Sequence, residues 1–248
     1  MKKLFFFASL IVTSSAFAQV LSPREDLFRL ASSINVGKAG PQIIRESDAN
    51  YARFVALDVN ATAHPNISRN DDTKGKPTSL SLENARAVLQ TAMLNEVVSL
   101  DKYSKYDKDN KGIGFCFGRA MFIDTYLAMA GFHRANIKKA FVVGPMSRGA
   151  WGWHVTTIAQ STDRAGNEIW LALDPVAGSV MDVKAWYKKW QGSSDDGKLR
   201  LFIAERTKFG AGASWYDENQ LSNPFYNNYF KDMMSWFGRN DVSDDLSL

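Results

Sequence analysis

The chain contains a single cysteine, Cys116, and its position is the first indication of chemistry. It follows a turn that contains Gly112 and Gly114 and directly precedes an apolar helical pattern over residues 117–130. Unpaired N–H groups and the dipole at the start of a helix favour negative charge, and the thiolate is the reactive form of cysteine. Cys116 is therefore a candidate nucleophile. A lone cysteine can also be a buried apolar residue or an intermolecular link, and both alternatives stay open.

A thiol nucleophile needs a base, which is usually a histidine held by a third group. The chain has three histidines. His64 lies in a polar loop and His133 follows the end of a helical pattern, whereas His154 lies inside an apolar strand pattern. A histidine in a strand is often an ordinary core or surface residue. His154 is nevertheless the candidate base among the three.

The third group is predicted from the strand that follows. A polar stretch, residues 161–167, separates the strand of His154 from an apolar strand that ends at Asp174. A hairpin turn centred on residue 164 places His154 and Asp174 directly opposite each other, on one face of the sheet. The carboxylate can then fix the imidazole tautomer and stabilise its charged form. The alternative is that Asp174 is only a turn residue before Pro175.

Cys116, His154 and Asp174 together predict a catalytic triad for acyl transfer. The thiolate attacks a carboxamide carbon, the imidazolium protonates the leaving ammonia or amine, and water hydrolyses the thioester. The backbone N–H of Cys116 is a candidate oxyanion donor. A helix-borne cysteine followed by a strand histidine and a strand aspartate is the order found in papain-like and transglutaminase-like folds. A zinc site formed by the same three residues is disfavoured because they lack paired ligand spacing.

Three ordered motifs resemble those of bacterial protein-glutaminase, a protein-glutamine deamidase family: CFGRA at 116–120, GWH at 152–154 and LDP at 173–175. The likeness spans residues 116–190. It implies that Cys116, His154 and Asp174 are the triad and that glutamine side chains of proteins or peptides become glutamate with release of ammonia. It also implies that no metal and no cofactor takes part.

The sequence departs from that family in three respects. Met121 stands where the family carries a histidine, no second cysteine exists for the family's disulfides, and residues 1–110 show no match. In the family a pro-region blocks the cleft. We therefore expect residues 19–100 to be either such a pro-region or a helical and loop lobe, and residues 101–240 to be the catalytic domain.

Two tryptophans flank the predicted active face and are candidate substrate-binding residues. Trp151 and Trp153 could form the walls of a channel for a glutamine side chain, and core packing is an equal alternative. By strand alternation Trp153 faces away from His154. Two related activities, transglutaminase and cysteine protease, use the same triad and stay open. A non-enzymatic alternative is an exported binding protein on an inactive scaffold.

The fold that must position these residues is predicted to be α+β, papain- or transglutaminase-like, with the cysteine-bearing helix packed on an antiparallel sheet. The elements that surround the candidate residues are predicted from hydrophobic periodicity and turn residues. Helices are expected over residues 22–34, 81–100, 117–130, 182–190 and 224–236. Strands are expected over residues 51–59, 139–144, 152–160, 168–174 and 199–205, and a long loop over residues 60–77.

Composition and the N-terminus limit location and partners. Residues 1–18 have a basic start, a short apolar run and a small-residue site after Ala18, which predicts a cleaved signal peptide and a secreted or periplasmic protein. No later run is long enough to span a bilayer. The net charge of +4 falls to about +2 when Lys2 and Lys3 are removed, and no basic block is present. We expect a monomer that binds no nucleic acid and does not insert stably into membranes.

Overall fold

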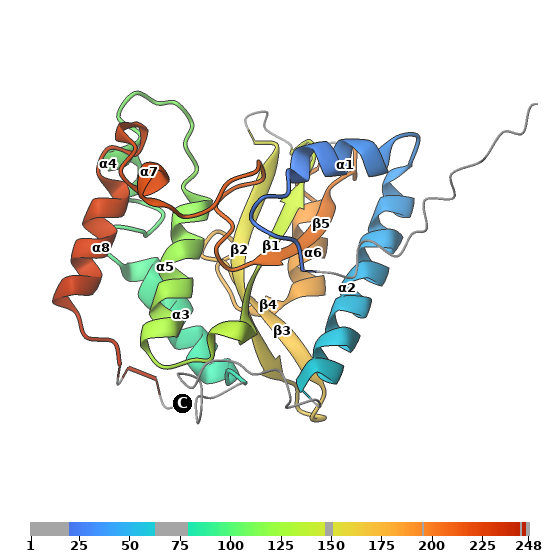
Figure 1. The fold of residues 1–248 in the computed structure, drawn as a ribbon, viewed down its shortest axis with the longest axis horizontal. Helices are drawn as coiled ribbons and strands as arrows, with labels where there is room; N and C mark the ends of the chain where they lie inside the picture. The colour runs from blue at the N-terminus through green and yellow to red at the C-terminus, as the bar shows by residue number, and fades with distance from the viewer. Residues whose placement is uncertain (1–19, 63–78, 147–150, 195, 244, 247–248) are drawn as a thin grey trace, which may run out of the picture.

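The computed structural model describes residues 20–62, 79–146, 151–194, 196–243 and 245–246. Within these residues the centre of the molecule is a five-stranded antiparallel sheet with the order β4-β3-β2-β1-β5 (Figure 1). The strands are β1 (Ile137–Val143), β2 (Trp153–Thr162), β3 (Glu168–Leu173), β4 (Met181–Asp182) and β5 (Arg200–Glu205). All four pairings are antiparallel. The predicted α+β class with an antiparallel sheet is confirmed.

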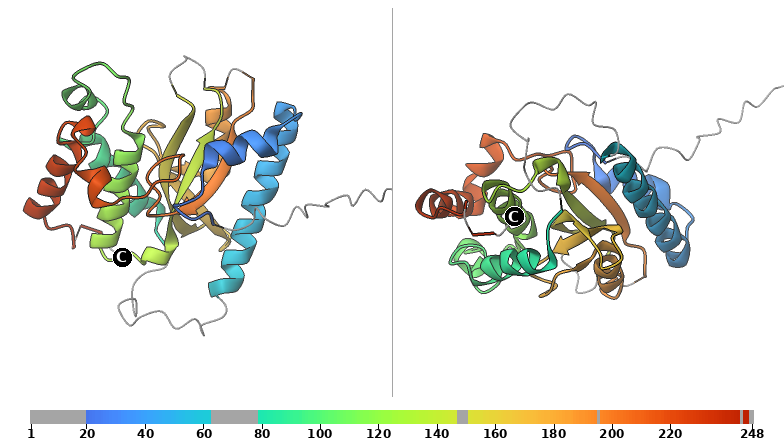
Figure 2. Two further views of the ribbon diagram at one scale, coloured as in Figure 1. Left: turned by 45° about the horizontal axis from the view of Figure 1, so that its top comes forward. Right: turned by 90° about the horizontal axis from the view of Figure 1, so that it is seen from below.

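Helices cover both faces of the sheet (Figures 1 and 2). One face carries α5 (Cys116–Met129), with α3 (Leu82–Leu94) and α8 (Tyr229–Arg239) packed around it, and the other carries α2 (Gly40–Thr62) and α6 (Val183–Gln191). Helix α1 (Leu27–Asn35) packs near β1. The short helices are α4 (Tyr103–Tyr106), η3 (Arg134–Asn136), α7 (Glu218–Leu221) and η4 (Pro224–Tyr226). The cysteine-bearing helix therefore packs on the sheet as predicted.

Strand alternation divides the interior into two apolar clusters. In β2, Val155 and Ala159 point into the cluster under α5, whereas Ile158 points into the cluster under α2 and α6. Successive side chains of a strand point to opposite faces, so the parity of each residue decides which cluster it joins. His154 has the parity of Ile158 and Trp153 has that of Val155. The sheet therefore lies between the two clusters.

The hairpin between β2 and β3 has a register different from the predicted one. Thr157 pairs with Leu173, which centres the turn on Ala165 rather than on residue 164. Moving the centre by one residue moves each cross-strand partner by two. His154 and Asp174 are therefore diagonal neighbours instead of direct partners, and Asp174 lies just beyond the end of β3. Because the cross-strand partner shifts by two residues, and side chains two residues apart point to the same face, His154 and Asp174 still lie on the same side of the sheet.

The predicted strand over residues 51–59 is wrong, because that segment is the second half of helix α2. Tyr51 and Phe54 are three residues apart, which is helical spacing, and both are buried in the cluster that contains Trp170 of β3. Arg53 between them is exposed. Aromatic and β-branched residues favour strands only weakly, and burial of one helical face against the sheet outweighs that preference.

Two other helices differ from prediction at their ends. Helix α1 begins at Leu27 with Asp26 as its N-cap, not at Ser22. Helix α3 has the predicted start, where the Ser81 side chain accepts a hydrogen bond from the Asn84 N–H at 3.0 Å. It ends at Leu94 because the next residue, Asn95, turns the chain with its side-chain oxygen.

The described residues among the first hundred contribute to the same layers as the rest of the described chain. Leu27 of α1 and Val88 of α3 belong to the cluster under α5, and Tyr51 of α2 belongs to the other. Leu21 pairs with Ala204 beside β5 in parallel orientation. The division at residue 100 and a cleavable pro-region stay predictions. The predicted signal peptide lies outside the described residues, and of the predicted loop 60–77 only residues 60–62 are described, as the end of α2.

In the part of the chain that the structure describes, no helix has both the length and the apolar character needed to cross a membrane.

Candidate active site

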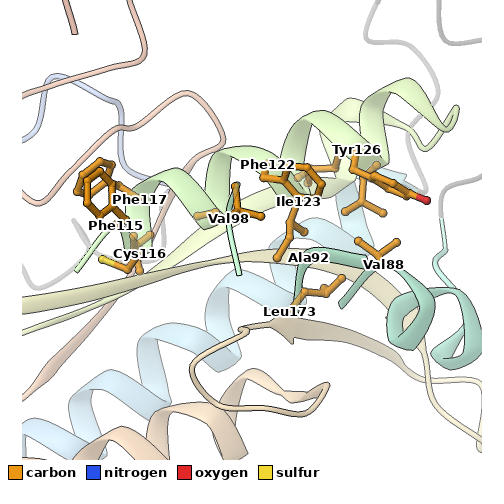
Figure 3. Close-up of a cluster of buried hydrophobic side chains, with 14 of the residues drawn as sticks. Val88, Ala92, Val98, Phe115, Cys116, Phe117, Phe122, Ile123, Tyr126 and Leu173 are labelled. Carbon is orange, nitrogen blue, oxygen red and sulfur yellow. The ribbon is translucent and has the colours of Figure 1, made fainter. Parts of the chain in front are cut away.

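Cys116 is the first residue of α5 and lies between that helix and the sheet (Figure 3). Its residue exposure is 7%, so the thiol is almost enclosed. The preceding residue, Phe115, is the N-cap and has no side chain that can accept a hydrogen bond from the first turn. Helix geometry leaves the first N–H groups without intrahelical partners. The N-terminus of α5 therefore presents polar hydrogens and the positive end of its dipole beside the sulfur.

The backbone turns sharply just before Cys116. Phe115 has a φ of 50°, in the left-handed region that bulky side chains rarely adopt. The ring is fully buried and lies 4.4 Å from the Tyr229 ring, centroid to centroid. Tyr229 also fills the space where a Cβ on Gly118 would lie, at 2.2 Å. Aromatic packing thus holds a strained residue in place, which is a frequent property of functional turns.

Hydrogen bonds from neighbouring residues fix the loop that leads to this turn. The Asp107 carboxylate accepts the backbone N–H groups of Lys111, Gly112 and Ile113 at 2.8, 2.9 and 3.1 Å. The buried Arg119 guanidinium donates to the Gly114 carbonyl. Asp107 therefore organises a plain turn with its oxygens occupied by donors. Arg119 holds the turn to the helix that follows it.

His154 is the second residue of β2 and is completely buried. Its Nε2 lies 2.8 Å from Oδ2 of Asp174. The ring packs against Trp190 of α6 in a tilted arrangement, with 4.0 Å between the ring centroids, and its centroid lies 6.1 Å from that of the Trp186 ring. These contacts hold the imidazole on both its edge and its face. Because Nε2 is engaged by Asp174, Nδ1 is the ring nitrogen that remains for other interactions.

Asp174 is 1% exposed and is surrounded by hydrogen-bond donors. Its Oδ2 accepts from His154, from Trp186 Nε1 at 2.8 Å and from Trp190 Nε1 at 3.2 Å. Its Oδ1 accepts the Val176 N–H at 2.9 Å. A buried carboxylate is tolerated only when such donors replace water. Asp174 is therefore a fixed negative charge directed at the imidazole.

Electrostatics make His154 and Asp174 a charged pair. Burial is the largest single influence on the pKa of His154 and opposes the charged ring, but Asp174 and the Cys116 thiol outweigh it and raise that pKa from 6.5 to about 9. Burial would also raise the pKa of Asp174, but its interactions with His154, Trp186 and the Val176 N–H lower it. At neutral pH the imidazole is protonated and the carboxylate is ionised.

The Cys116 thiol is one of the groups that influence the pKa of His154. After Asp174, the thiol is the next group that acts to raise the pKa of His154, although Cys116 belongs to the cluster under α5 and the ring of His154 contacts α6. Both residues lie at one end of their elements, the first residue of α5 and the second of β2. The Nδ1 atom of His154 is buried and forms no hydrogen bond to the described residues. His154 and Asp174 are thus in direct contact, and Cys116, at the start of α5, is one of the groups that influence the imidazole.

The two tryptophans predicted to bind substrate lie in different environments. Trp151 is 36% exposed, donates from Nε1 to the Gly112 carbonyl at 3.3 Å, and packs so closely on Gly114 that a Cβ there would lie 2.5 Å away. Trp153 is partly buried between Phe117 and Phe141, with centroid distances of 6.3 and 5.9 Å. Trp153 therefore faces away from His154, as predicted, and makes core contacts. Trp151 lies at the surface beside the turn.

Sequence reasoning did not assign roles to Trp186 and Trp190, although both contact His154 and Asp174. The available signal was their spacing of four residues on one helix directly after Asp174, because residues four apart share a helix face. Of the other two histidines, His64 lies outside the described residues and His133 is the N-cap of η3. In the described part of the chain, no group of three or more His, Cys, Asp or Glu residues could hold a metal ion.

Comparisons with known proteins give one kind of match. No protein-family model matches the sequence, and no curated protein matches it. A solved structure of a mutant pro-protein-glutaminase aligns with a TM-score of 0.46 and 15% identity over 71% of this chain and 68% of that chain. A protein-glutaminase structure aligns with a TM-score of 0.43 and 15% identity, over 64% of this chain and 86% of that chain. The structure of protein-glutaminase from Chryseobacterium proteolyticum aligns with a TM-score of 0.36 and 18% identity, over 53% of this chain and 73% of that chain.

Proposed function

We propose that the chain is an exported thiol amidase that converts glutamine side chains of proteins or peptides to glutamate and releases ammonia. The observation that carries the proposal is the buried His154, which is hydrogen-bonded to Asp174 at 2.8 Å and influenced by the thiol of Cys116. The motifs at 116–120, 152–154 and 173–175, which resemble protein-glutaminase, support the choice of substrate. The export rests on the N-terminal pattern of residues 1–18.

In this proposal each residue has one role. The Cys116 thiolate attacks the carboxamide carbon, and the tetrahedral oxyanion faces the N–H groups at the start of α5. Nδ1–H of the His154 imidazolium protonates the leaving ammonia, and the C–N bond breaks to leave a thioester. Water then attacks the thioester carbon while His154 accepts a proton, and glutamate and the thiolate are released. Asp174 holds Nε2 and stabilises the charged ring throughout.

Trp151 is the proposed wall of the substrate entrance. It is exposed, it lies on the glycines of the turn before Cys116, and an indole face can pack along the methylene groups of a glutamine side chain. Trp153 is proposed to act indirectly, by packing on Phe117 next to the cysteine. A Trp151→Ala variant should raise KM more than it lowers kcat, because it removes binding area rather than a reacting group.

The test is ammonia release from a glutamine-containing peptide, with the peptide mass followed in parallel. A gain of about 1 Da at glutamine, with no chain cleavage and no amine incorporation, supports the proposal; the Cys116→Ala variant is the control and should be inactive. Cleaved peptide bonds would indicate a cysteine protease, and incorporation of an added amine would indicate a transglutaminase. No reaction of any kind, with Cys116 alkylated no faster than a free thiol, would indicate the inactive binding protein.

A further inference from the structure

A second charged group lies behind the candidate nucleophile. Lys139, in the middle of β1, is completely buried. It pairs with Thr157 of β2, whose hydroxyl donates to the Ala120 carbonyl of α5 at 2.5 Å, so Lys139 faces the first turns of that helix. A buried lysine is rare unless its ammonium is paired. Among the described residues, no carboxylate forms an ion pair with the Lys139 ammonium.

The contacts of Lys139 connect it to the residue after Cys116. Its Nζ lies 3.8 Å from the centroid of the Tyr216 ring, and the Tyr216 hydroxyl donates to the Phe117 carbonyl at 2.5 Å. Nζ also donates to the Lys208 carbonyl at 2.9 Å. A cation over an aromatic face is held in position without being neutralised. The ammonium form of Lys139 is therefore held in place, desolvated and without an ion pair to a carboxylate among the described residues.

The charged groups around Lys139 come from α5 and from the segment after β5, and most of them are engaged by other partners. Asp124 of α5 is engaged by Arg206, which follows β5, through two hydrogen bonds of 2.8 and 2.9 Å. Lys208 donates to three backbone carbonyls. Burial is the main cause of the lowered pKa of Lys139, about 7, while Asp124 and the Cys116 thiol act to raise it. Charge interactions in the interior are weakly screened, so the influence between Lys139 and Cys116 is mutual.

We propose that Lys139 is a positioning residue for the proposed reaction, whose buried ammonium stabilises the thiolate of Cys116 from behind helix α5. This inference rests on Cys116 being the nucleophile of the proposed function. It adds a cation that the triad does not contain. His154 supports the sulfur from β2 and the ammonium form of Lys139 supports it from β1, so two cationic groups from neighbouring strands stabilise the negative charge.

The experiment measures alkylation of Cys116 by iodoacetamide from pH 5 to pH 10 in the full-length protein and its variants. Lys139→Met should slow alkylation about three- to tenfold at pH 6, with the rates converging near pH 10, where every thiol is ionised. Lys138→Met is the matched control, because it removes the neighbouring lysine of β1, which by strand alternation points to the opposite face of the sheet and pairs with Glu205 at 3.6 Å. Its rate–pH curve should follow that of the wild type. Coincident curves for all three proteins would overturn the proposal.

A reciprocal measurement covers the case in which Lys139→Met fails to fold. The titration of Lys139 is followed by NMR of ¹³C-labelled lysine in the wild type and in Cys116→Ser. Removing the thiolate should move the Lys139 midpoint to lower pH, and an unchanged midpoint would refute the coupling. Alkylation and titration report on the thiolate whatever amide is hydrolysed. A shifted curve without ammonia release would therefore reject the proposed function and retain the role of Lys139.

Discussion

Replacing Asp174 with asparagine should abolish the charged state of His154 while leaving the fold in place. The substitution keeps the volume of the side chain and removes its negative charge. Oδ2 accepts three side-chain donors in the wild type, from His154, Trp186 and Trp190. An amide has one acceptor oxygen and one donor nitrogen, so its NH2 group must face either these three donors or the Val176 N–H that Oδ1 accepts, and at least one of the four contacts is lost. The imidazole then loses its main electrostatic support.

The expected loss of activity in Asp174→Asn follows from the pKa of His154. That pKa is raised from 6.5 to about 9, which corresponds to about 3 kcal/mol of net preference for the charged ring. Burial opposes the charged ring and is the largest influence, so without Asp174 it should bring the pKa below 6.5. At pH 7.5 the protonated fraction of His154 then falls from nearly complete to about one tenth or less. Because the leaving ammonia needs that proton, kcat/KM should fall at least tenfold, and by up to about 10⁴-fold if the ring also changes tautomer.

The assay is an NMR titration of the His154 ring in Cys116→Ser and in Cys116→Ser/Asp174→Asn, alongside ammonia release by Asp174→Asn at pH 7.5. The matched control is Asp182→Asn, at the N-cap of α6, where asparagine caps as well as aspartate. The control should leave both the His154 midpoint and the rate near the wild-type values. A His154 midpoint that is equal in the presence and absence of the Asp174 charge would refute the reasoning.

Three further predictions concern the same region. Ammonia release by the wild type should decline as the pH rises through about 9, because the imidazolium that protonates ammonia is lost there; a decline centred near 6.5 would contradict the raised pKa of His154. Trp186→Phe removes one donor to Asp174 and should lower kcat several-fold with little change in KM, measured by steady-state kinetics. Gly118→Ala should destabilise the protein by about 2 kcal/mol or more in urea unfolding, because its Cβ would lie 2.2 Å from the Tyr229 ring. Gly238→Ala, in helix α8 with open space at its Cβ, is the matched control and should be neutral or stabilising; equal losses for the two alanines would show that the Tyr229 contact is not the cause.

Much of the fold followed from local signals. The helix that begins at Cys116 and four of the five predicted strands lie within about two residues of their observed bounds, because periodicity and turn residues act locally. The segment 51–59 was assigned to the wrong class because its aromatic and β-branched residues favour strands, whereas the sheet face it covers is defined only by the tertiary fold. The shift of the hairpin turn to Ala165 has a related cause: the polar stretch 161–167 accommodates more than one turn, and the pairing of the strands selects among them.

The candidate triad was inferred from residue types and order, but its surroundings were not. The four-residue spacing of Trp186 and Trp190 indicates a shared helix face, but not that this face donates to Asp174, because that depends on where α6 packs. The positive φ of Phe115 is also invisible in the sequence, since a phenylalanine normally avoids that conformation and is held there by Tyr229. The sequence therefore predicts which residues are candidates for the triad, whereas the residues that hold them in place are determined by tertiary packing.

The division of the interior into two clusters explains why these supports matter. The sulfur of Cys116 is placed by the cluster under α5, whereas Asp174 and its tryptophan donors are placed by the cluster on the other face. His154 is the only one of the three that belongs to a strand, and its parity directs the ring toward α6. A slip of one residue in the register of β2 would turn that ring into the α5 cluster and bring Trp153 and Val155 to the opposite face. The pairing of β2 with β1 and β3 is thus the structural condition on which the charged pair, and with it the proposed chemistry, depends.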